Sequence, residues 1–234
     1  MTHPELTAAG YDVSAAAHRR LAHFVRALLA ENQTLNLTAA RAPDEVWAVH
    51  VCDSLALTAW IGEHRVARLL DLGSGGGLPG IPLACACAGL DVTLLDATRK
   101  KVAALERIIQ RVGLEHAHAV WGRAETLAHD PAHRERFDAV VARAVATLPV
   151  LIEYAAGFVR TGGYAWFFKS QSAADTEAAQ AEPAARACKL VYADTLRYRL
   201  PGEPAERVIV GYRKTGLLGA ELPRRAGRAR KRPL

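Results

Sequence analysis

Residues 71–80 read Asp-Leu-Gly-Ser-Gly-Gly-Gly-Leu-Pro-Gly, and this stretch decides the fold. It follows the apolar run 68–72, which has the length of a buried strand. Glycines directly after a strand allow a tight turn and let a ligand lie against the backbone. Pro79 is suited to the first turn of a following helix. The stretch therefore predicts a strand, a turn and a helix arranged around a nucleoside cofactor.

Downstream of this stretch, short apolar runs alternate with helical patterns. Strands are expected at residues 68–72, 92–95, 117–120, 138–142 and 164–168. Helices are expected near residues 81–88, 99–112, 125–128 and 148–159. Such alternation is typical of βαβ units and predicts an α/β fold with a doubly wound, Rossmann-like sheet. A helix at 172–186 and an antiparallel pair at 190–197 and 206–213 are expected to extend it.

The residues before the first strand are predicted to be helical. Apolar side chains recur at helical spacing from residue 13 to 31, with Asp12 placed to cap that helix. A second helix is expected over residues 43–60. With 234 residues, one structural domain is the expectation. We divide it into a helical cap (1–62), a cofactor-binding core (63–215) and a basic tail (216–234).

The net charge of +6 is concentrated in residues 223–234, which hold six basic residues and no acidic one. Without this segment, basic and acidic residues balance. Its six cations are Arg224, Arg225, Arg228, Arg230, Lys231 and Arg232. A short segment of this composition is not expected to pack a core, which leaves a disordered solubilising end or an arm that follows a nucleic-acid backbone. Arg224 and Arg225 are the candidates for RNA contact.

Composition also argues against several classes of protein. No run of 18 apolar residues occurs, and the first residues lack the pattern of a secretory signal, so we expect a cytoplasmic protein without membrane association. The four cysteines show no CxxC spacing. They predict buried thiols and no metal site. No obligate protein partner is evident, and we expect a monomer.

The glycine loop alone leaves two cofactor classes open. Residues 75–80 match G-x-G-x-x-G, which permits NAD or a flavin. Asp71 followed by Gly73 and Gly75 is instead the usual methyltransferase form of the loop. Asp96 ends the second predicted strand, where its carboxylate would accept the ribose hydroxyls of either cofactor.

The third strand end favours S-adenosylmethionine. Arg123, Ala124 and Glu125 follow that strand, at the place where methyltransferases commonly hold adenine and dinucleotide enzymes have no comparable requirement. The residues at the ends of the first three predicted strands together predict S-adenosylmethionine as cofactor.

Several motifs together resemble one family, the bacterial small-subunit ribosomal RNA guanine-N7 methyltransferases known as RsmG or GidB. The motifs lie at residues 36–38 (Asn-Leu-Thr), 50–55 (His-Val-Cys-Asp-Ser-Leu), 71–83, 94–101 and 143–148. The sequence Leu-Pro-Gly-Ile-Pro after the glycines and the His-x-x-Asp-Ser-Leu motif are uncommon elsewhere. Two positions depart from the family pattern, which often has proline where Gly76 stands and glycine where Ser170 follows Lys169.

The resemblance implies a class I methyltransferase that methylates N7 of one guanine, guanine 527, in 16S ribosomal RNA or the small ribosomal subunit. It implies a cofactor site formed by Gly73, Leu78, Ala124, Glu125 and Arg143, to which we add Gly75 from the loop and Asp96 from the ribose argument. Three alternatives remain: an NAD-linked dehydrogenase, a methyltransferase acting on another substrate, and a non-catalytic RNA-binding module.

Guanine N7 carries a free lone pair and no proton, so methyl transfer to it requires no general base. Orientation and contacts to the base or its phosphates would supply catalysis. Arg143 is the best catalytic candidate, because it would lie between cofactor and guanine. Arg123 and Lys169, at neighbouring strand ends, are candidates for RNA phosphates.

Two further groups are given structural roles. His50 and Asp53 lie three apart on one helical face and could form a metal or acid/base pair, but we favour a local hydrogen bond that fixes the helix. The tryptophans at 47, 60, 121 and 166 are expected in the core.

Overall fold

The computed structural model describes residues 3–234 and contains a seven-stranded sheet of order β3-β2-β1-β4-β5-β7-β6. The strands are β1 (Arg68–Leu72), β2 (Asp91–Asp96), β3 (Ala117–Trp121), β4 (Phe137–Arg143), β5 (Val159–Ser170), β6 (Leu190–Tyr198) and β7 (Arg207–Lys214). The first five strands run parallel, whereas β7 is antiparallel to both β5 and β6. The predicted doubly wound α/β fold is confirmed, including its antiparallel extension.

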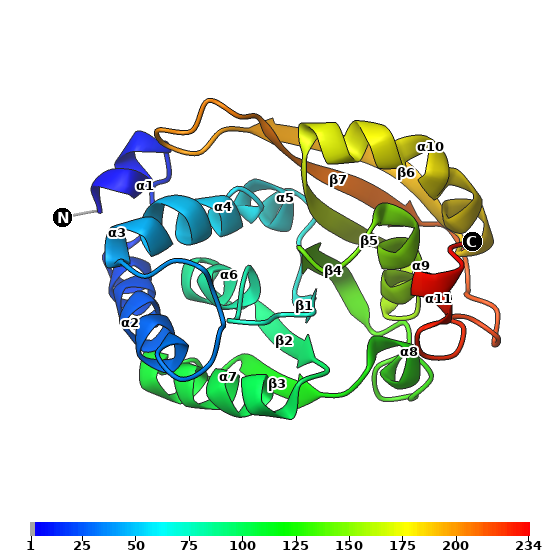
Figure 1. Cartoon of the computed structure of the whole chain (residues 1–234), viewed down its shortest axis with the longest axis horizontal. Coiled ribbons are helices and arrows are strands. Elements are labelled where there is room, and N and C mark those ends of the chain that lie inside the picture. The colour runs from blue at the N-terminus through cyan, green and yellow to red at the C-terminus, as the bar shows by residue number, and fades with distance from the viewer. Residues whose placement is uncertain (1–2) are drawn as a thin grey trace.

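Helices cover both faces of the sheet (Figure 1). They are α1 (Pro4–Ala8), α2 (Ala15–Asn32), α3 (Pro43–Glu45), the π-helical η1 (Val46–Val51), α4 (Cys52–Leu55), α5 (Thr58–Glu63), α6 (Gly80–Ala86), α7 (Arg99–Val112), α8 (Ala124–Leu127), α9 (Leu148–Ala156), α10 (Gln171–Ala187) and α11 (Arg228–Lys231). Successive strand residues point to opposite faces, so Leu69 and Leu70 join different apolar cores. Helices α2, α6 and α7 pack on one face, and α9, α10 and α11 on the other.

The order of the strands positions the functional site. Chain progression reverses between β1 and β4, which are direct neighbours in the sheet. At such a switch point the connections leave for opposite faces and open a crevice at the carboxyl ends of the strands. Residues 71–80 begin at the carboxyl end of β1, so the glycine loop lies at this crevice.

The helical cap differs from the prediction in detail. Helix α2 is capped by Ser14, whose Oγ accepts the Ala17 N–H at 3.2 Å, and the assignment of that cap to Asp12 was wrong. The single helix predicted over 43–60 is interrupted by the π-helical η1. There the Ser54 hydroxyl donates to the His50 carbonyl at 2.7 Å, and such back-bonding bends a helix.

Three of the four tryptophans are buried as predicted, namely Trp47, Trp60 and Trp166. The prediction for Trp121 was wrong, since 51% of this residue is exposed. Its Nε1–H donates to the Ala97 carbonyl at 3.1 Å, and the Arg99 guanidinium lies 4.3 Å from its ring centre. These contacts hold the indole at the carboxyl edge instead of the core.

The C-terminal tail is packed against the body of the protein. Leu218, Leu222 and Ala229 are buried in the core on the α9 side of the sheet. The expectation that this segment cannot pack a core is therefore wrong. Arg134 helps to hold it, because its guanidinium donates to the carbonyls of residues 218, 219 and 222 at 2.9–3.1 Å.

Within residues 3–234, no helix has the length and apolarity needed to cross a bilayer. In the same part of the chain, His, Cys, Asp and Glu side chains form no group of three that could hold a metal ion.

Candidate functional site

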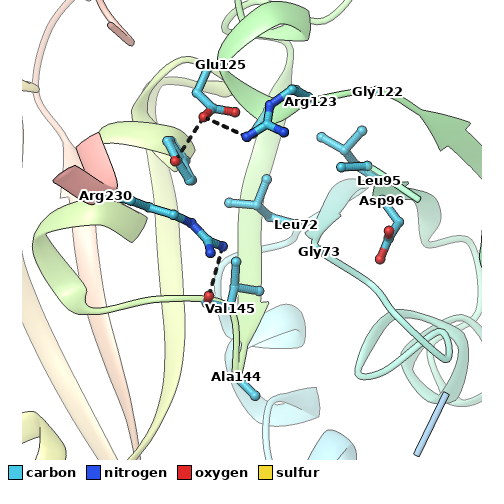
Figure 2. Close-up of a pocket in the computed structure, with 13 residues that line it drawn as sticks. Leu72, Gly73, Leu95, Asp96, Gly122, Arg123, Glu125, Ala144, Val145 and Arg230 are labelled. Atoms are coloured by element: carbon cyan, nitrogen blue, oxygen red, sulfur yellow. Dashed lines mark hydrogen bonds and ion pairs between the residues drawn. The ribbon is translucent and has the colours of Figure 1, made fainter. Parts of the chain in front are cut away.

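A cavity of about 280 Å³ opens at the carboxyl ends of β1, β2, β3 and β4 (Figure 2). Its lining consists of Leu72, Gly73, Leu95, Asp96, Ala97, Gly122, Arg123, Ala124, Glu125, Ala144, Val145, Tyr154 and Arg230. Among the residues predicted from the sequence, Gly73, Asp96, Arg123, Ala124 and Glu125 meet here. We call this cavity the cofactor pocket.

Gly73 lines the pocket next to the loop that follows β4. Its φ is +75°, and a Cβ at this position would lie 2.6 Å from a methyl group of Val145. No other residue fits without displacing that wall. Gly75 and Leu78 stand outside the lining: Gly75 turns the loop at a φ of +56°, and Leu78 is buried in the core. The predicted contacts of these two residues with the cofactor stay predictions.

Asp96 joins the loop to the second strand. Its Oδ2 accepts the Gly75 N–H at 3.0 Å, and its Oδ1 accepts the Thr98 N–H at 2.8 Å. Each carboxylate oxygen retains a second lone pair, so a diol can still be bound from the pocket side. The carboxylate thus suits the ribose of an adenosine cofactor.

Replacing Asp96 by asparagine is expected to weaken binding of S-adenosylhomocysteine about 10–100-fold, since charge-assisted hydrogen bonds contribute roughly 1.5–3 kcal/mol. An amide has one acceptor oxygen instead of two and cannot serve both the loop and the ribose. Isothermal titration calorimetry measures the effect. Asp91→Asn, at the half-buried start of the same strand and outside the pocket lining, is the control and should bind like the wild type. Equal affinity of both variants would contradict the assignment.

The side chain of Asp71, near the end of β1, reaches the start of helix α6. Its Oδ2 accepts the Gly80 N–H at 2.9 Å, the residue is fully buried, and its Oδ1 has no hydrogen-bond partner among residues 3–234. In dinucleotide-binding proteins the amides at this helix start hold the pyrophosphate. A carboxyl group already bound there leaves no place for one. The residues present thus fit a nucleoside cofactor without a pyrophosphate, such as S-adenosylmethionine.

Burial raises the pKa of Asp71 from 3.8 to about 7, although the Gly80 hydrogen bond and Arg143 oppose the rise. The folded state therefore binds more protons than the unfolded state between about pH 4 and 7, and stability falls as pH rises through that window. In Asp71→Asn this pH-dependent loss of stability is absent. The melting temperature of the variant minus that of the wild type should be larger at pH 8 than at pH 5, by differential scanning fluorimetry. The same difference at both pH values would contradict this.

Glu125 is tied to two distant segments. Its Oε1 accepts the Tyr154 hydroxyl at 3.0 Å and the Gly227 N–H at 2.8 Å, and the Arg123 guanidinium lies 3.6 Å away. Burial would raise the pKa of this carboxyl, but the Gly227 and Tyr154 hydrogen bonds outweigh it, so the pKa is lowered. The ionised side chain thus fixes helix α9 and the tail against the strand end where adenine binding was predicted.

A second cavity, of about 410 Å³, adjoins the cofactor pocket. Its lining consists of Asp53, Arg143, Ala144, Phe168, Lys169, Ser170, Tyr198, Glu203, Ala205, Glu206 and Arg207. Ala144 lines both cavities and has a φ of +56°. A non-glycine residue in this conformation is strained, and such strain is concentrated at functional sites. We call this second space the cationic pocket after its three basic residues, which share the lining with three carboxylates.

Arg143 is held in the cationic pocket by the helical cap. Its Nη1 donates to Asp53 Oδ2 at 2.7 Å, and Asp53 Oδ1 also accepts the Tyr198 hydroxyl at 2.6 Å. His50 lies against the other guanidinium nitrogen at 3.4 Å. The predicted local hydrogen bond between His50 and Asp53 is thus replaced by separate contacts of each with Arg143. Burial and Arg143 lower the pKa of His50 to about 4, so its ring is neutral at pH 7.

The remaining predicted cations fall into two groups. Arg123 and Arg225 are exposed. Lys169 and Arg224 are engaged with the protein itself: Lys169 Nζ donates to Glu177 and to the Ala146 carbonyl, both at 2.8 Å, and Arg224 pairs with Glu153 at 2.6 Å. The structure corrects the expectation for Arg224, because its guanidinium faces a fully buried carboxylate.

Sequence reasoning missed several residues of the cofactor pocket. Val145 and Tyr154 carry no motif, and only the fold brings them to the site. Arg230 was counted as one of the tail cations, but its guanidinium reaches the pocket and donates to the Val145 carbonyl at 3.2 Å (Figure 2). No signal in the sequence separates it from the five other tail cations.

Comparisons with known proteins agree with this geometry. Residues 17–199 match the family model of GidB, described as rRNA small subunit methyltransferase G. Two curated proteins named "Ribosomal RNA small subunit methyltransferase G" are similar over most of their length. The protein of Carboxydothermus hydrogenoformans is 38% identical over 90% of this chain and 89% of its own, and that of Gloeobacter violaceus is 39% identical over 88% and 82%.

Solved structures support the fold. An O-methyltransferase from Bacillus cereus in complex with SAH superposes with a TM-score of 0.58 at 17% identity, covering 82% of this chain and 91% of that one. A putative O-methyltransferase from Klebsiella pneumoniae gives a TM-score of 0.56 at 15% identity, covering 82% and 90%. The predicted fold, cofactor and family are confirmed: the chain belongs to the rRNA small subunit methyltransferase G family and is an S-adenosylmethionine-dependent methyltransferase.

Proposed function

We propose that this protein transfers a methyl group from S-adenosylmethionine to N7 of one guanine in 16S ribosomal RNA, guanine 527 by the family resemblance. Its substrate would be the RNA itself or the small ribosomal subunit. It would act as a monomer in the cytoplasm. The observation that carries the proposal is the pair of adjoining pockets that share Ala144, one fitted to a nucleoside and the other containing Arg143, which Asp53 holds in place.

Two pockets that meet at one residue suit direct transfer of the methyl group from the cofactor in one pocket to a base in the other. The nucleophile must lie about 3 Å from the methyl carbon, opposite the departing sulfur. A cofactor whose ribose is held by Asp96 would carry its methionine portion along the strand ends toward Ala144. A guanine in the cationic pocket would then approach the methyl group from the other side of the same residue.

The chemistry of the cationic pocket fits an unprotonated acceptor. Guanine N7 already has its lone pair, and beside it O6 is a second acceptor that Arg and Lys side chains recognise. Arg143 supplies a guanidinium held by Asp53 at 2.7 Å. The neutral ring of His50 contacts that guanidinium and is not required as a base. The residues thus orient the base while its own lone pair reacts.

Lys169 and Arg207 also line the cationic pocket, and each is paired with a carboxylate. Flanking phosphates of the RNA would be attracted by the exposed Arg123 and Arg225, because backbone charge dominates affinity for nucleic acids. Lys169 is placed by Glu177 and so would offer a fixed contact.

The test is to map N7-methylguanine in ribosomal RNA from cells with and without the protein, by borohydride reduction and aniline cleavage. We expect one cleavage site in 16S RNA that is lost with the protein. Identical cleavage patterns would refute the RNA substrate while leaving the cofactor assignment intact.

A further inference from the structure

The C-terminal arm, defined as residues 222–232, places α11 beside α9 (Figure 1), and its Arg230 lines the cofactor pocket. Two sets of contacts attach it. Arg224 donates from its backbone and its guanidinium to Glu153 of α9 at 2.6–3.2 Å, and the Pro223 carbonyl contacts His129 at 2.8 Å. Since Glu153 is fully buried, this attachment belongs to the folded core. The arm has a fixed position relative to the pocket.

The middle of the arm contacts a residue that lines the pocket. The Gly227 N–H donates to Glu125 Oε1, which also accepts the Tyr154 hydroxyl. A single carboxylate oxygen thus joins the β3 end, helix α9 and the arm. Burial raises the pKa of Tyr154 to about 12, and the charge of Glu125 adds to the rise, whereas Arg230 opposes it. Arg230 and Tyr154 both line the cofactor pocket.

The end of the arm forms a wall of the pocket. Arg230 donates to the Val145 carbonyl at 3.2 Å and lines the cavity from the side opposite Asp96 (Figure 2). Part of its side chain is still exposed. A guanidinium has five N–H donors and a flat face that stacks on aromatic rings. One contact with Val145 leaves both the remaining donors and that face available to a ligand.

We propose that Arg230 is a binding residue for the adenosine portion of S-adenosylmethionine, and that the C-terminal arm completes the cofactor pocket. Asp96 and the β3 end would hold the adenosine on one side, and the arm would close the other. This inference rests on the cofactor and not on the RNA substrate. It gives the basic tail a role that its composition did not suggest.

The matched control lies in the same short helix. Arg228 is exposed, and its side chain makes no hydrogen bond or ion pair within residues 3–234. Replacing it by alanine removes the same charge from the arm without touching the pocket. Any effect of general tail charge on a ligand should be equal in the two variants, whereas a direct contact should be lost only with Arg230.

Isothermal titration calorimetry on the full chain tests the proposal. Arg230→Ala should bind S-adenosylhomocysteine about 10-fold more weakly or worse, as expected for one good hydrogen bond or stacking contact, while Arg228→Ala should bind as the wild type does. Adenosine, measured by competition, should lose affinity by the same factor in Arg230→Ala. Unchanged affinity of Arg230→Ala, an equal loss in Arg228→Ala, or a loss for S-adenosylhomocysteine without one for adenosine would each overturn it. Failure of the RNA mapping would leave these affinities unaffected.

Discussion

Replacing Arg143 by alanine should lower the rate of methyl transfer to ribosomal RNA about 10²–10³-fold, the range seen when one preorganised donor is removed from an active site. Arg143 directly precedes Ala144, the residue that both pockets share, and Asp53 holds it in place. Without it, the guanine would lose both orientation and a partner for its O6. A radiolabelled methyl assay on small subunits measures the rate.

The variant should still fold. Asp53 retains two partners, Tyr198 at 2.6 Å and Arg207 at 3.4 Å, so its buried charge stays compensated. The matched control is Arg160→Ala, which breaks an Arg–Asp pair of the same 2.7 Å length with Asp138, near the start of β4. Full activity of Arg143→Ala, or equal loss in both variants, would refute the assigned role.

Replacing Arg224 by alanine should reduce the free energy of unfolding by about 3–5 kcal/mol, the usual cost of breaking a buried ion pair from one side. Glu153 is fully buried and would keep only the backbone N–H of residue 224 as a donor from the arm. For a chain of this length the melting temperature should drop by roughly 10 °C. Thermal and urea unfolding followed by circular dichroism measure both quantities.

The neighbouring Arg225 provides the control. It is exposed and carries the same charge, so Arg225→Ala should melt within about 1 °C of the wild type. If Arg224→Ala and Arg225→Ala had the same melting temperature, the ion pair with Arg224 would not be what compensates the buried charge of Glu153. The pair of variants thus separates a structural arginine from a surface one in the same basic segment.

Much of the fold could be predicted because local patterns carry it. The apolar runs at 68–72 and 117–120 match β1 and β3 closely, and Asp96 ends its strand as expected. Parallel strands share one carboxyl edge, so residues directly after them meet without further information. For this reason Gly73, Asp96 and Glu125 could be brought to one pocket from the sequence alone.

The rest depends on contacts between residues far apart in the chain. Arg143 and Asp53 are 90 residues apart, and Glu125 and Gly227 are 102 apart. No repeating pattern in the sequence indicates such long-range contacts. The composition of the tail was misleading for the same reason. In the sequence, an arginine that pairs with a buried carboxylate cannot be distinguished from an arginine exposed to solvent. Only the position of Glu153 in the folded state distinguishes Arg224 from Arg225.

The path of the C-terminal arm also constrains how the protein matures. During synthesis the chain emerges from its N-terminal end, and domains begin to fold before the C-terminal end is released. The residues that cover Glu153 and line the pocket at Arg230 leave the ribosome after the helical cap and all seven strands. A nascent chain can therefore form the helical cap and the strands β1 to β5 while its cofactor pocket still lacks one wall. Each molecule would gain its complete pocket only after residue 230 has been synthesised and has left the ribosome.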